Sequence, residues 1–399
     1  MAAAPPADQA KEPIFTVPFV SLMMANGFLR VGTYMLVTLM PLYALDRGVS
    51  TTTASLTVTF YMLAAVLVRP VSGRLVDTRG RYVVMVCGSV LYCATTGLYA
   101  LSLPVWLLLL VRALQGVGFS LNGTAVMTLA TDLIPESRMS EGIGYLGVEQ
   151  TVAQLFAPWL AFAVKDTYGY RTAFLVVFAL SAANVLARLP LKFADKGPLP
   201  GPPPASAAAG TPWWGRIVEK NAWRPALVMF FVMTGATSVN TFMAAHTADH
   251  GISNPGPFFT ASALTLALAR LTAGRTQRRF GTAWTIAPGI VLVAVALLLV
   301  FWSPNLPVLM AGGACYGLGM GTAQPGINAL AVLAADRAQR GLANSTFFMA
   351  MDLSQAVGAV ALGALAGLTG IGMVFLASSG VLVATAVAYL TLRSRGFVE

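Results

Sequence analysis

Two carboxylic acids and two arginines stand deep inside apolar runs of this sequence. The acids are Glu149 and Asp352, and the deep cations are Arg30 and Arg112. Burial favours the protonated form of a carboxyl group unless a cation stabilises the charged form, so such a group can take up and release a proton. We expect proton coupling at these four residues, with Glu149 and either Arg30 or Arg112 as the preferred pair. A fixed structural ion pair is the alternative.

No cluster suited to covalent or metal catalysis accompanies these acids. The two histidines, His246 and His250, fall in one outer loop, where Asp249 is the one acid at ligand spacing and no Cys is near. We expect them to be solvated. The chain also contains no Gly-Lys-Ser/Thr phosphate loop. These observations argue against an enzyme, a bound metal or cofactor, and direct use of ATP.

Helices that cross a membrane must position these residues. Of the 399 residues, 57% are hydrophobic, and apolar runs of about 20 residues, enough to cross a hydrocarbon core, recur along the chain. They predict an all-α membrane protein with twelve transmembrane helices. The expected helices are 14–44, 52–74, 81–102, 104–132, 139–164, 170–192, 222–247, 255–275, 283–303, 305–333, 340–368 and 370–392. No signal-peptide pattern precedes the first, so we expect it to be retained.

The predicted helices form two similar halves. Three short stretches recur in the same order, at spacings of 201 or 203 residues, which indicates a duplicated unit. The pairs are "ALDRGVS" (44–50) with "TADHGIS" (247–253), "RPVSGR" (69–74) with "RLTAGR" (270–275), and "QGVGF" (115–119) with "YGLGM" (316–320). A stretch rich in Pro, Gly and Ala separates the halves. We therefore predict two pseudo-symmetric six-helix bundles at 14–192 and 222–393, joined by a cytoplasmic linker at 193–221.

The net charge of +10 lies mainly on one side of the predicted membrane. With the N-terminus inside, most Lys and Arg fall in inner loops, including a group from Arg188 to Arg224. Only Arg47, Lys165 and Arg171 face outwards. This distribution follows the positive-inside rule, so we expect a multi-pass protein of the cell membrane with both termini in the cytoplasm. The expected partner is the lipid bilayer and not a nucleic acid.

The most polar stretch, "RPVSGRLVDTRGR" (69–81), spans the inner end of the second predicted helix and the loop after it. Its last nine residues resemble the loop motif of the major facilitator superfamily, Gly-x-Leu-x-Asp-x-x-Gly-Arg. The matching residues are Gly73, Leu75, Asp77, Gly80 and Arg81. The resemblance implies the fold of that superfamily and a latch that joins the two bundles while the outside is open. A loop that only obeys charge topology is the alternative.

Asp77 is the acid of this motif, and it can either pair with Arg81 or accept hydrogen bonds from a neighbouring helix N-terminus. The second copy, "GRTQRRFG", has Arg278 at the corresponding place. It cannot supply the same acid, so we expect an asymmetric latch.

Two further stretches resemble the drug–proton antiporters of that superfamily, the twelve-helix branch. "RALQGVGF" (112–119) resembles their Arg-x-x-x-Gly motif, and "QLFAPWLA" (154–161) has Ala157-Pro158 where they have Gly-Pro. The neighbouring glycines of the second motif are absent. The resemblance implies a role for Arg112 in proton coupling and a kink in the fifth helix.

Polar and aromatic side chains that interrupt apolar helices are candidates for contact with a substrate, although some must serve as contacts between helices. They are Asn26, Tyr34, Asn122, Gln150, Asn240, Asn328, Phe347 and Gln355. The leading hypothesis is a monomeric secondary transporter that couples protons to the efflux of amphipathic small molecules by alternating access. The alternative within the superfamily is a solute importer, or an exporter of lipids or metallophores. A channel is disfavoured because the duplicated bundles and the loop motif indicate alternating access.

Overall fold

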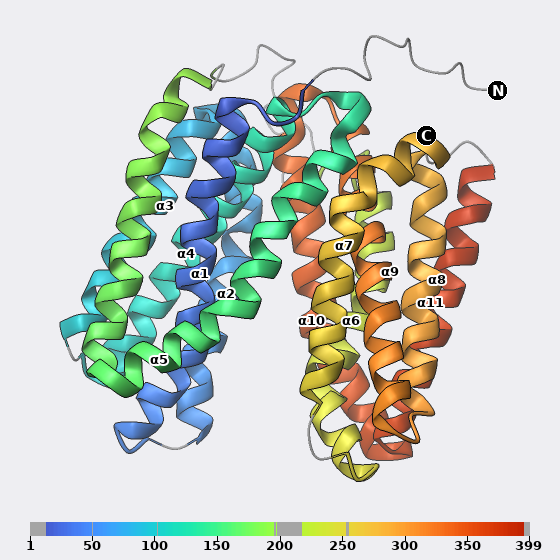
Figure 1. Ribbon diagram of the computed structural model, residues 1–399. Helices are drawn as coiled ribbons and strands as arrows, with labels where there is room; N and C mark the ends of the chain where they lie inside the picture. Colours follow the sequence, from blue (N-terminus) through green and yellow to red (C-terminus); the bar gives the residue numbers. More distant parts are fainter. Residues whose placement is uncertain are drawn as a thin grey trace, which may run out of the picture. The chain divides into compact units, whose positions relative to one another are not determined.

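The computed structural model describes residues 13–49, 51–101, 103–194, 197, 218–252 and 255–394. The long elements of this part are eleven α-helices (Figure 1). They are α1 (Val17–Asp46), α2 (Thr51–Arg79), α3 (Arg81–Leu98), α4 (Val105–Leu133), α5 (Met139–Arg188), α6 (Trp223–Asp249), α7 (Gly256–Phe280), α8 (Thr282–Phe301), α9 (Leu306–Leu333), α10 (Arg340–Thr369) and α11 (Ile371–Ser394). The termini and most of the predicted linker lie outside the described residues.

The helix α5 contains the fifth and sixth predicted helices. Its backbone is broken at Gly169, with φ 81° and ψ 172°, a conformation that glycine adopts at little cost. Figure 1 shows the chain turning sharply within α5 and then running in the opposite direction. The eleven named helices therefore contain twelve helical segments, which confirms the predicted fold class.

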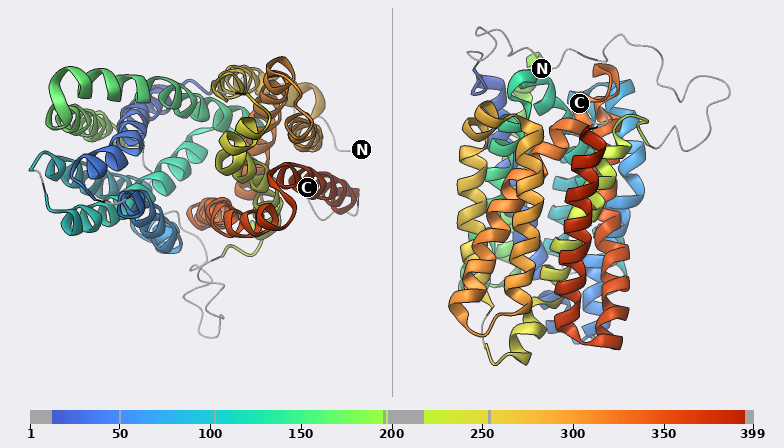
Figure 2. Two further views of the ribbon diagram at one scale, coloured as in Figure 1. Left: turned by 90° about the horizontal axis from the view of Figure 1, so that it is seen from below. Right: turned by 90° about the vertical axis from the view of Figure 1, so that its right-hand side faces the viewer.

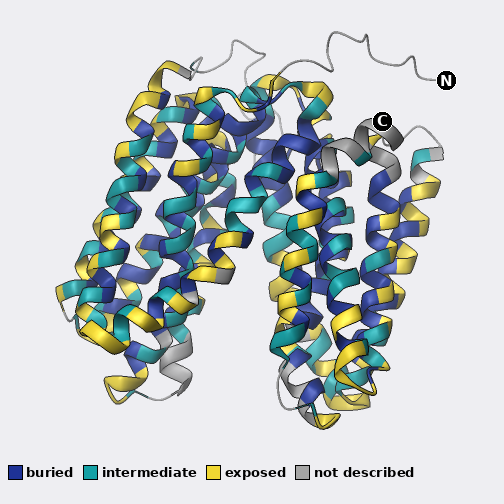
Figure 3. Ribbon diagram, viewed as in Figure 1, coloured by how far each residue is buried: buried dark blue, intermediate teal, exposed yellow. Residues whose placement is uncertain are grey.

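The lengths and composition of the helices fit a membrane protein. Nine helices of the described part are long and apolar enough to cross a membrane. In α8 the apolar stretch is shorter, Thr285–Phe301. The helix α7 is not among these nine, and four arginines stand among its last eleven residues. Many large apolar side chains are exposed on the helices, as lipid contact requires. Figure 3 shows exposed residues along the helices of both halves of the chain.

The duplication predicted from sequence is also visible in the backbone. Positive φ occurs at Gly48 and Gly251, at Gly80 and Gly281, and at Gly169 and Gly370. These three pairs are 203, 201 and 201 residues apart, so equivalent turns recur in both halves. Helix contacts repeat as well, because α4 packs on α2 and α3 while α9 packs on α7 and α8. Figure 2 shows these neighbouring helices from two further directions.

Two compact units result from this packing, and each takes in a short segment from the other half of the sequence. Unit 1 contains residues up to Ser137, Glu149–Glu219 and Asp336–Ser345. Unit 2 contains Arg138–Val148, Lys220–Ala335 and Thr346–Glu399. The start of α10 therefore belongs to unit 1, together with the polar motif of residues 69–81.

Candidate functional site

The carboxylate of Asp77 caps the N-terminus of α10. Its two oxygens accept the backbone N–H groups of Gly341 and Leu342, each at 2.9 Å. These N–H groups belong to the first turn of the helix and have no partner within it. A carboxylate there is also stabilised by the helix dipole. Of the two partners considered from sequence, the structure shows the helix N-terminus.

Close backbone approach makes this cap possible. A Cβ atom added to Gly73 would lie 2.7 Å from Cβ of Ser345, and one added to Gly341 would lie 2.6 Å from Oδ1 of Asp77 and 2.8 Å from the Gly73 carbonyl oxygen. The hydroxyl of Ser345 donates to the carbonyl of Arg69 beside this crossing. Glycine is therefore required on both helices, which explains Gly73 in the motif and identifies Gly341 as its partner.

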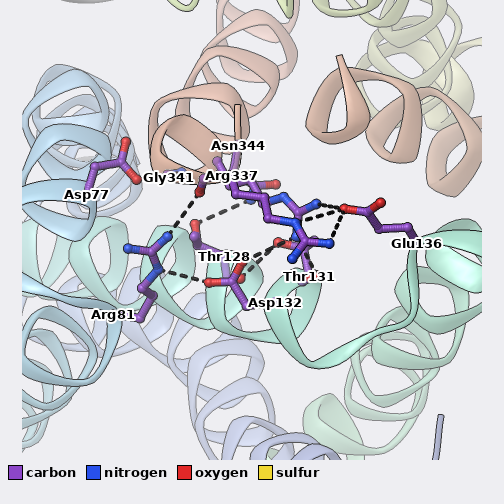
Figure 4. A network of polar contacts seen from close by, with 10 residues as sticks. Asp77, Arg81, Thr128, Thr131, Asp132, Glu136, Arg337, Gly341 and Asn344 are labelled. Atoms are coloured by element: carbon purple, nitrogen blue, oxygen red, sulfur yellow. Dashed lines mark hydrogen bonds and ion pairs between the residues drawn. The ribbon is translucent and has the colours of Figure 1, made fainter. Parts of the chain in front are cut away.

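A network of charged side chains surrounds the cap (Figure 4). Arg81 donates from Nε to Asp132 at 2.9 Å, and from Nη2 to the carbonyl of Arg337 at 3.2 Å. Arg340 donates to Asp132 at 3.4 Å and to Glu136 at 2.7 Å. The side chain of Arg340 is 5% exposed. The arginine of the motif therefore pairs with the end of α4 and not with Asp77.

Sequence reasoning missed Asp132, Glu136, Arg337 and Arg340. The acids stand in "TDLIPES" (131–137), at the inner end of the fourth predicted helix, and the arginines belong to the positive charge of the predicted inner loops. The signal available in the sequence for such a network was the presence of acids at one inner helix end and of arginines at another. Sequence alone could not pair them. The side chain of Arg278, in the second copy of the motif, lies outside what the structure describes.

Glu149 lies in a second polar cluster, inside unit 1. Asn26 of α1 donates its side-chain N–H to a carboxylate oxygen of Glu149. Its own side-chain oxygen accepts from Arg188 at 3.5 Å. Arg188 also donates to Ser89 at 2.7 Å and to Asn122 at 3.0 Å. Two substrate candidates, Asn26 and Asn122, thus belong to a buried cluster around Arg188, which is 0% exposed although its position suggested an inner loop.

A third polar contact joins two predicted substrate residues. The hydroxyl of Tyr34 in α1 accepts from Gln150 at 3.1 Å and from Gln154 at 2.8 Å, both in α5. Gln150 directly follows Glu149 in the chain. Tyr34 and Gln150 are partly exposed and Gln154 is exposed, so this part of unit 1 offers hydroxyl and amide groups next to the carboxylate.

The two deep arginines named from sequence have contacts of their own. Arg112 donates to the carbonyl of Thr57 at 2.9 Å and to Gln115 at 2.6 Å, and its guanidinium lies 4.5 Å from the ring centre of Tyr61. These bonds connect α4 with α2. Arg30 lies over the ring of Phe119, 5.5 Å from its centre.

The remaining candidates lie in unit 2, and their contact with a substrate stays a prediction. Asn328 and Phe347 are 1% exposed, while Asn240 and Gln355 are exposed. Both side-chain polar atoms of Asn328 lack a hydrogen-bond partner. Asp352, the second predicted proton carrier, is partly buried in α10.

The expectation that both histidines are solvated is wrong for His246. This side chain is 0% exposed, and its Nε2 lies 2.8 Å from the carbonyl oxygen of Val300. Its ring packs against Phe375, with centres 4.8 Å apart. The last turns of α6 bury His246 against α8 and α11, whereas His250 is exposed. No group of three or more potential metal ligands occurs in the part of the chain that the structure describes.

The helical architecture, its repeated turns and the cap formed by the motif at residues 73–81 can now be compared with known proteins. The family model for the Major Facilitator Superfamily matches residues 22–258 and 225–397. The chain belongs to this superfamily, and it is therefore a multi-pass membrane transporter and not an enzyme.

Individual relatives are distant. The uncharacterized MFS-type transporter YhhS of Escherichia coli O6:H1 is 25% identical over 95% of this chain and 93% of its own. A multi-drug resistance efflux pump PmrA homolog of Lactococcus lactis is 33% identical over 37% of each chain. The staphylopine export protein of Staphylococcus aureus is 21% identical over 91% of this chain and 90% of its own.

Solved structures support the fold. A bacterial homologue of the iron transporter ferroportin, in its outward-facing state, superimposes with a TM-score of 0.79. The alignment covers 95% of this chain and all of that one, at 16% sequence identity. A likeness at this identity identifies the architecture and carries no information about the cargo.

Proposed function

We propose that this transporter couples the movement of protons to the export of amphipathic small molecules. The observation that carries the proposal is Glu149, a carboxylate within a membrane-spanning helix that accepts a hydrogen bond from the buried Asn26. A carboxyl group at such a place is stable either as a bonded anion or as a neutral acid. Switching between these forms changes its contacts, so proton binding is linked to conformation.

The cap on α10 supplies a structural element that such a switch can act on. The bonds from Gly341 and Leu342 to Asp77 form when the start of α10 lies against α2. We propose that they break when the transporter exposes its substrate site to the other side of the membrane. A bond made in one state alone shifts the equilibrium by its own free energy.

The direction and the class of cargo are supported by relatives and composition. The Lactococcus lactis relative is named as an efflux pump and the Staphylococcus aureus relative as an export protein. The helices carry few deep charges and the chain has 17 Met residues, which suits an oily, adaptable site better than a sugar site. We therefore favour export over solute import, and amphipathic cargo over lipids or metallophores. We further propose that it works as a monomer in the cell membrane.

Flux measurements in proteoliposomes test this proposal. The purified protein is reconstituted, a pH gradient is imposed, and the movement of cationic, neutral and anionic test compounds is followed. We expect gradient-driven flux of at least one amphipathic compound. We expect Glu149→Gln to abolish it while cargo binding and passive counterflow persist, and Asp352→Asn to be less damaging.

Each outcome has a distinct meaning. Full gradient-driven flux in Glu149→Gln would exclude Glu149 as the proton carrier. Loss of flux in Asp352→Asn alone would transfer that role to Asp352. Flux that ignores the pH gradient in the wild type would contradict proton coupling, and flux of sugars alone would contradict the proposed cargo.

A further inference from the structure

Arg188 is a fully buried charge that the proposed mechanism has not yet used. It ends α5, where its side chain is 0% exposed. One of its terminal nitrogens, Nη1, donates to Ser89 at 2.7 Å and to Asn122 at 3.0 Å, and the other, Nη2, donates to Asn26 at 3.5 Å. A buried guanidinium is costly unless neutral acceptors and an anion stabilise it. The three acceptors are neutral, so the compensating charge must come from elsewhere.

The fold of α5 brings an anion to the level of Arg188. Glu149 precedes the break at Gly169 by 20 residues, and Arg188 follows it by 19. The two parts of α5 run in opposite directions from the turn (Figure 1). Residues at nearly equal distances along the chain from the turn are therefore expected at similar depths in the membrane. Both lie about 30 Å from the turn, at 1.5 Å per residue.

Asn26 joins the two charges. Its N–H group donates to Glu149 and its oxygen accepts from Arg188. This orientation of the amide matches both charges, since the N–H meets the anion and the carbonyl meets the cation. Each bond polarises the other, so the three side chains form a carboxylate–amide–guanidinium chain. Asn26 is 3% exposed, so water has little access to the amide between the two charges.

Further charged and titratable groups lie near these three side chains. Arg188 lies in the field of Glu149, which stabilises its charge, and of Arg30, which opposes it. Tyr34 of α1 is the titratable group that contacts the next residue, Gln150. Arg112 makes its bonds with Thr57 and Gln115, away from this chain.

We propose that Arg188 is the positioning residue that supplies the countercharge of Glu149, acting through Asn26. The inference rests on the proposed role of Glu149 as the proton carrier. In it, Arg188 takes the place of Arg30 and Arg112 as the charged partner of Glu149. Arg188 stabilises the ionised carboxylate, so it determines the pH at which Glu149 gains its proton. Protonation of Glu149 weakens the bond from Asn26 and leaves Arg188 without its anion, which favours rearrangement of α1 against α5.

The test measures protonation of Glu149 without relying on transport. Dicyclohexylcarbodiimide reacts with protonated carboxyl groups at apolar sites, and mass spectrometry of the peptide that contains Glu149 reports its modification. The full-length protein in liposomes is labelled across a pH series. We expect Arg188→Gln to move the labelling midpoint upward by about 1 to 3 pH units, because an opposite charge is lost. Arg188→Lys, which keeps the charge, should restore most of the shift, and Asn26→Ala should move the midpoint in the same direction.

Two matched variants remove other deep arginines of unit 1. Arg112→Gln and Arg30→Gln should each move the midpoint less than Arg188→Gln does. An unchanged midpoint in a folded Arg188→Gln protein would overturn the inference, as would a larger shift in Arg30→Gln. If Arg188→Gln does not fold, Asn26→Ala decides, and an unchanged midpoint there overturns the inference.

The two proposals can fail separately. If the labelling midpoint shifts in Arg188→Gln but Glu149→Gln retains full gradient-driven flux, Arg188 is the countercharge of Glu149, and Glu149 is not the proton carrier. If the midpoint does not shift in Arg188→Gln but Glu149→Gln loses the flux, Glu149 remains the proton carrier, and Arg188 is not its countercharge.

Discussion

The carboxylate of Asp77 accepts the backbone N–H of Gly341 at 2.9 Å, across 264 positions of sequence. An acid at the end of α2 thereby caps a helix from the opposite half of the chain. Its geometry uses backbone groups of α10, so no side chain at position 341 is needed and none fits.

The charge of this cap can be removed with little change of shape. Asp77→Asn keeps one oxygen acceptor but loses the attraction between the carboxylate and the helix N-terminus, which contributes about 1 to 2 kcal/mol in a partly buried site. We expect initial transport rates to fall roughly 5- to 30-fold at matched protein amount. The elution profile in detergent should remain that of the wild type. Wild-type rates would remove the proposed role of Asp77 as a latch.

The close approach of the two helices predicts a purely steric effect. Gly341→Ala places a methyl group 2.6 Å from Oδ1 of Asp77, so the cap must open or shift. Such overpacking costs about 1 to 3 kcal/mol, and transport should fall without any change of charge. Gly380→Ala in α11 is the matched control, since no atom lies within 4 Å of the added methyl group. Equal transport rates in the two variants would contradict this reading of the crossing.

The two arginines that contact Glu136 should differ in importance. Arg340 is 5% exposed and also bonds the carbonyl of Thr131 and the carboxylate of Asp132, whereas Arg337 is 70% exposed. Loss of buried bonds to charged groups costs about 1.5 to 3 kcal/mol. An exposed pair, screened by solvent, contributes about 0 to 1 kcal/mol. In detergent, Arg340→Ala should therefore unfold at a clearly lower temperature than Arg337→Ala. The reverse order would contradict the assigned geometry.

Variants of Arg112 can distinguish a structural role of this residue from a direct role in proton coupling. Its guanidinium bonds Thr57 and Gln115 and lies over the ring of Tyr61, so Arg112→Ala removes two buried hydrogen bonds from a charged donor and the contact with the ring. We expect impaired coupling together with a loss of at least about 2 kcal/mol of stability. Lysine should not rescue it, because one ammonium group cannot reproduce the fork geometry. Native thermal stability combined with lost gradient-driven flux would instead indicate a direct part in proton transfer.

The proposed orientation in the membrane is tested by accessibility. Cysteines introduced at Arg79 and Thr211 should react with an impermeant maleimide from the cytoplasmic side only, and one at Asp249 from outside only. The reason is the excess of Lys and Arg in the predicted inner loops. Labelling of position 211 from outside intact cells would overturn this topology.

Much of the architecture follows from local sequence. Helix number, the break between the fifth and sixth spans, and the duplicated halves are all determined by apolar runs, glycines and repeated stretches. These signals are local because a helix in lipid must satisfy its own backbone hydrogen bonds. The motif at residues 73–81 likewise singled out Gly73 and Asp77, although it left open whether Asp77 pairs with Arg81 or caps a helix.

Only the tertiary structure decided which charges meet. Arg81 and Arg188 both stand next to predicted inner loops, and the pattern of positive charge is the same whether such a residue is solvated or buried. The structure pairs Arg81 with Asp132 and buries Arg188 beside Asn26. The same ambiguity hid the burial of His246 at an outer helix end. Side-chain depth at a helix end depends on which neighbouring helix packs there, and that packing joins residues far apart in the chain, as Asp77 and Gly341 do.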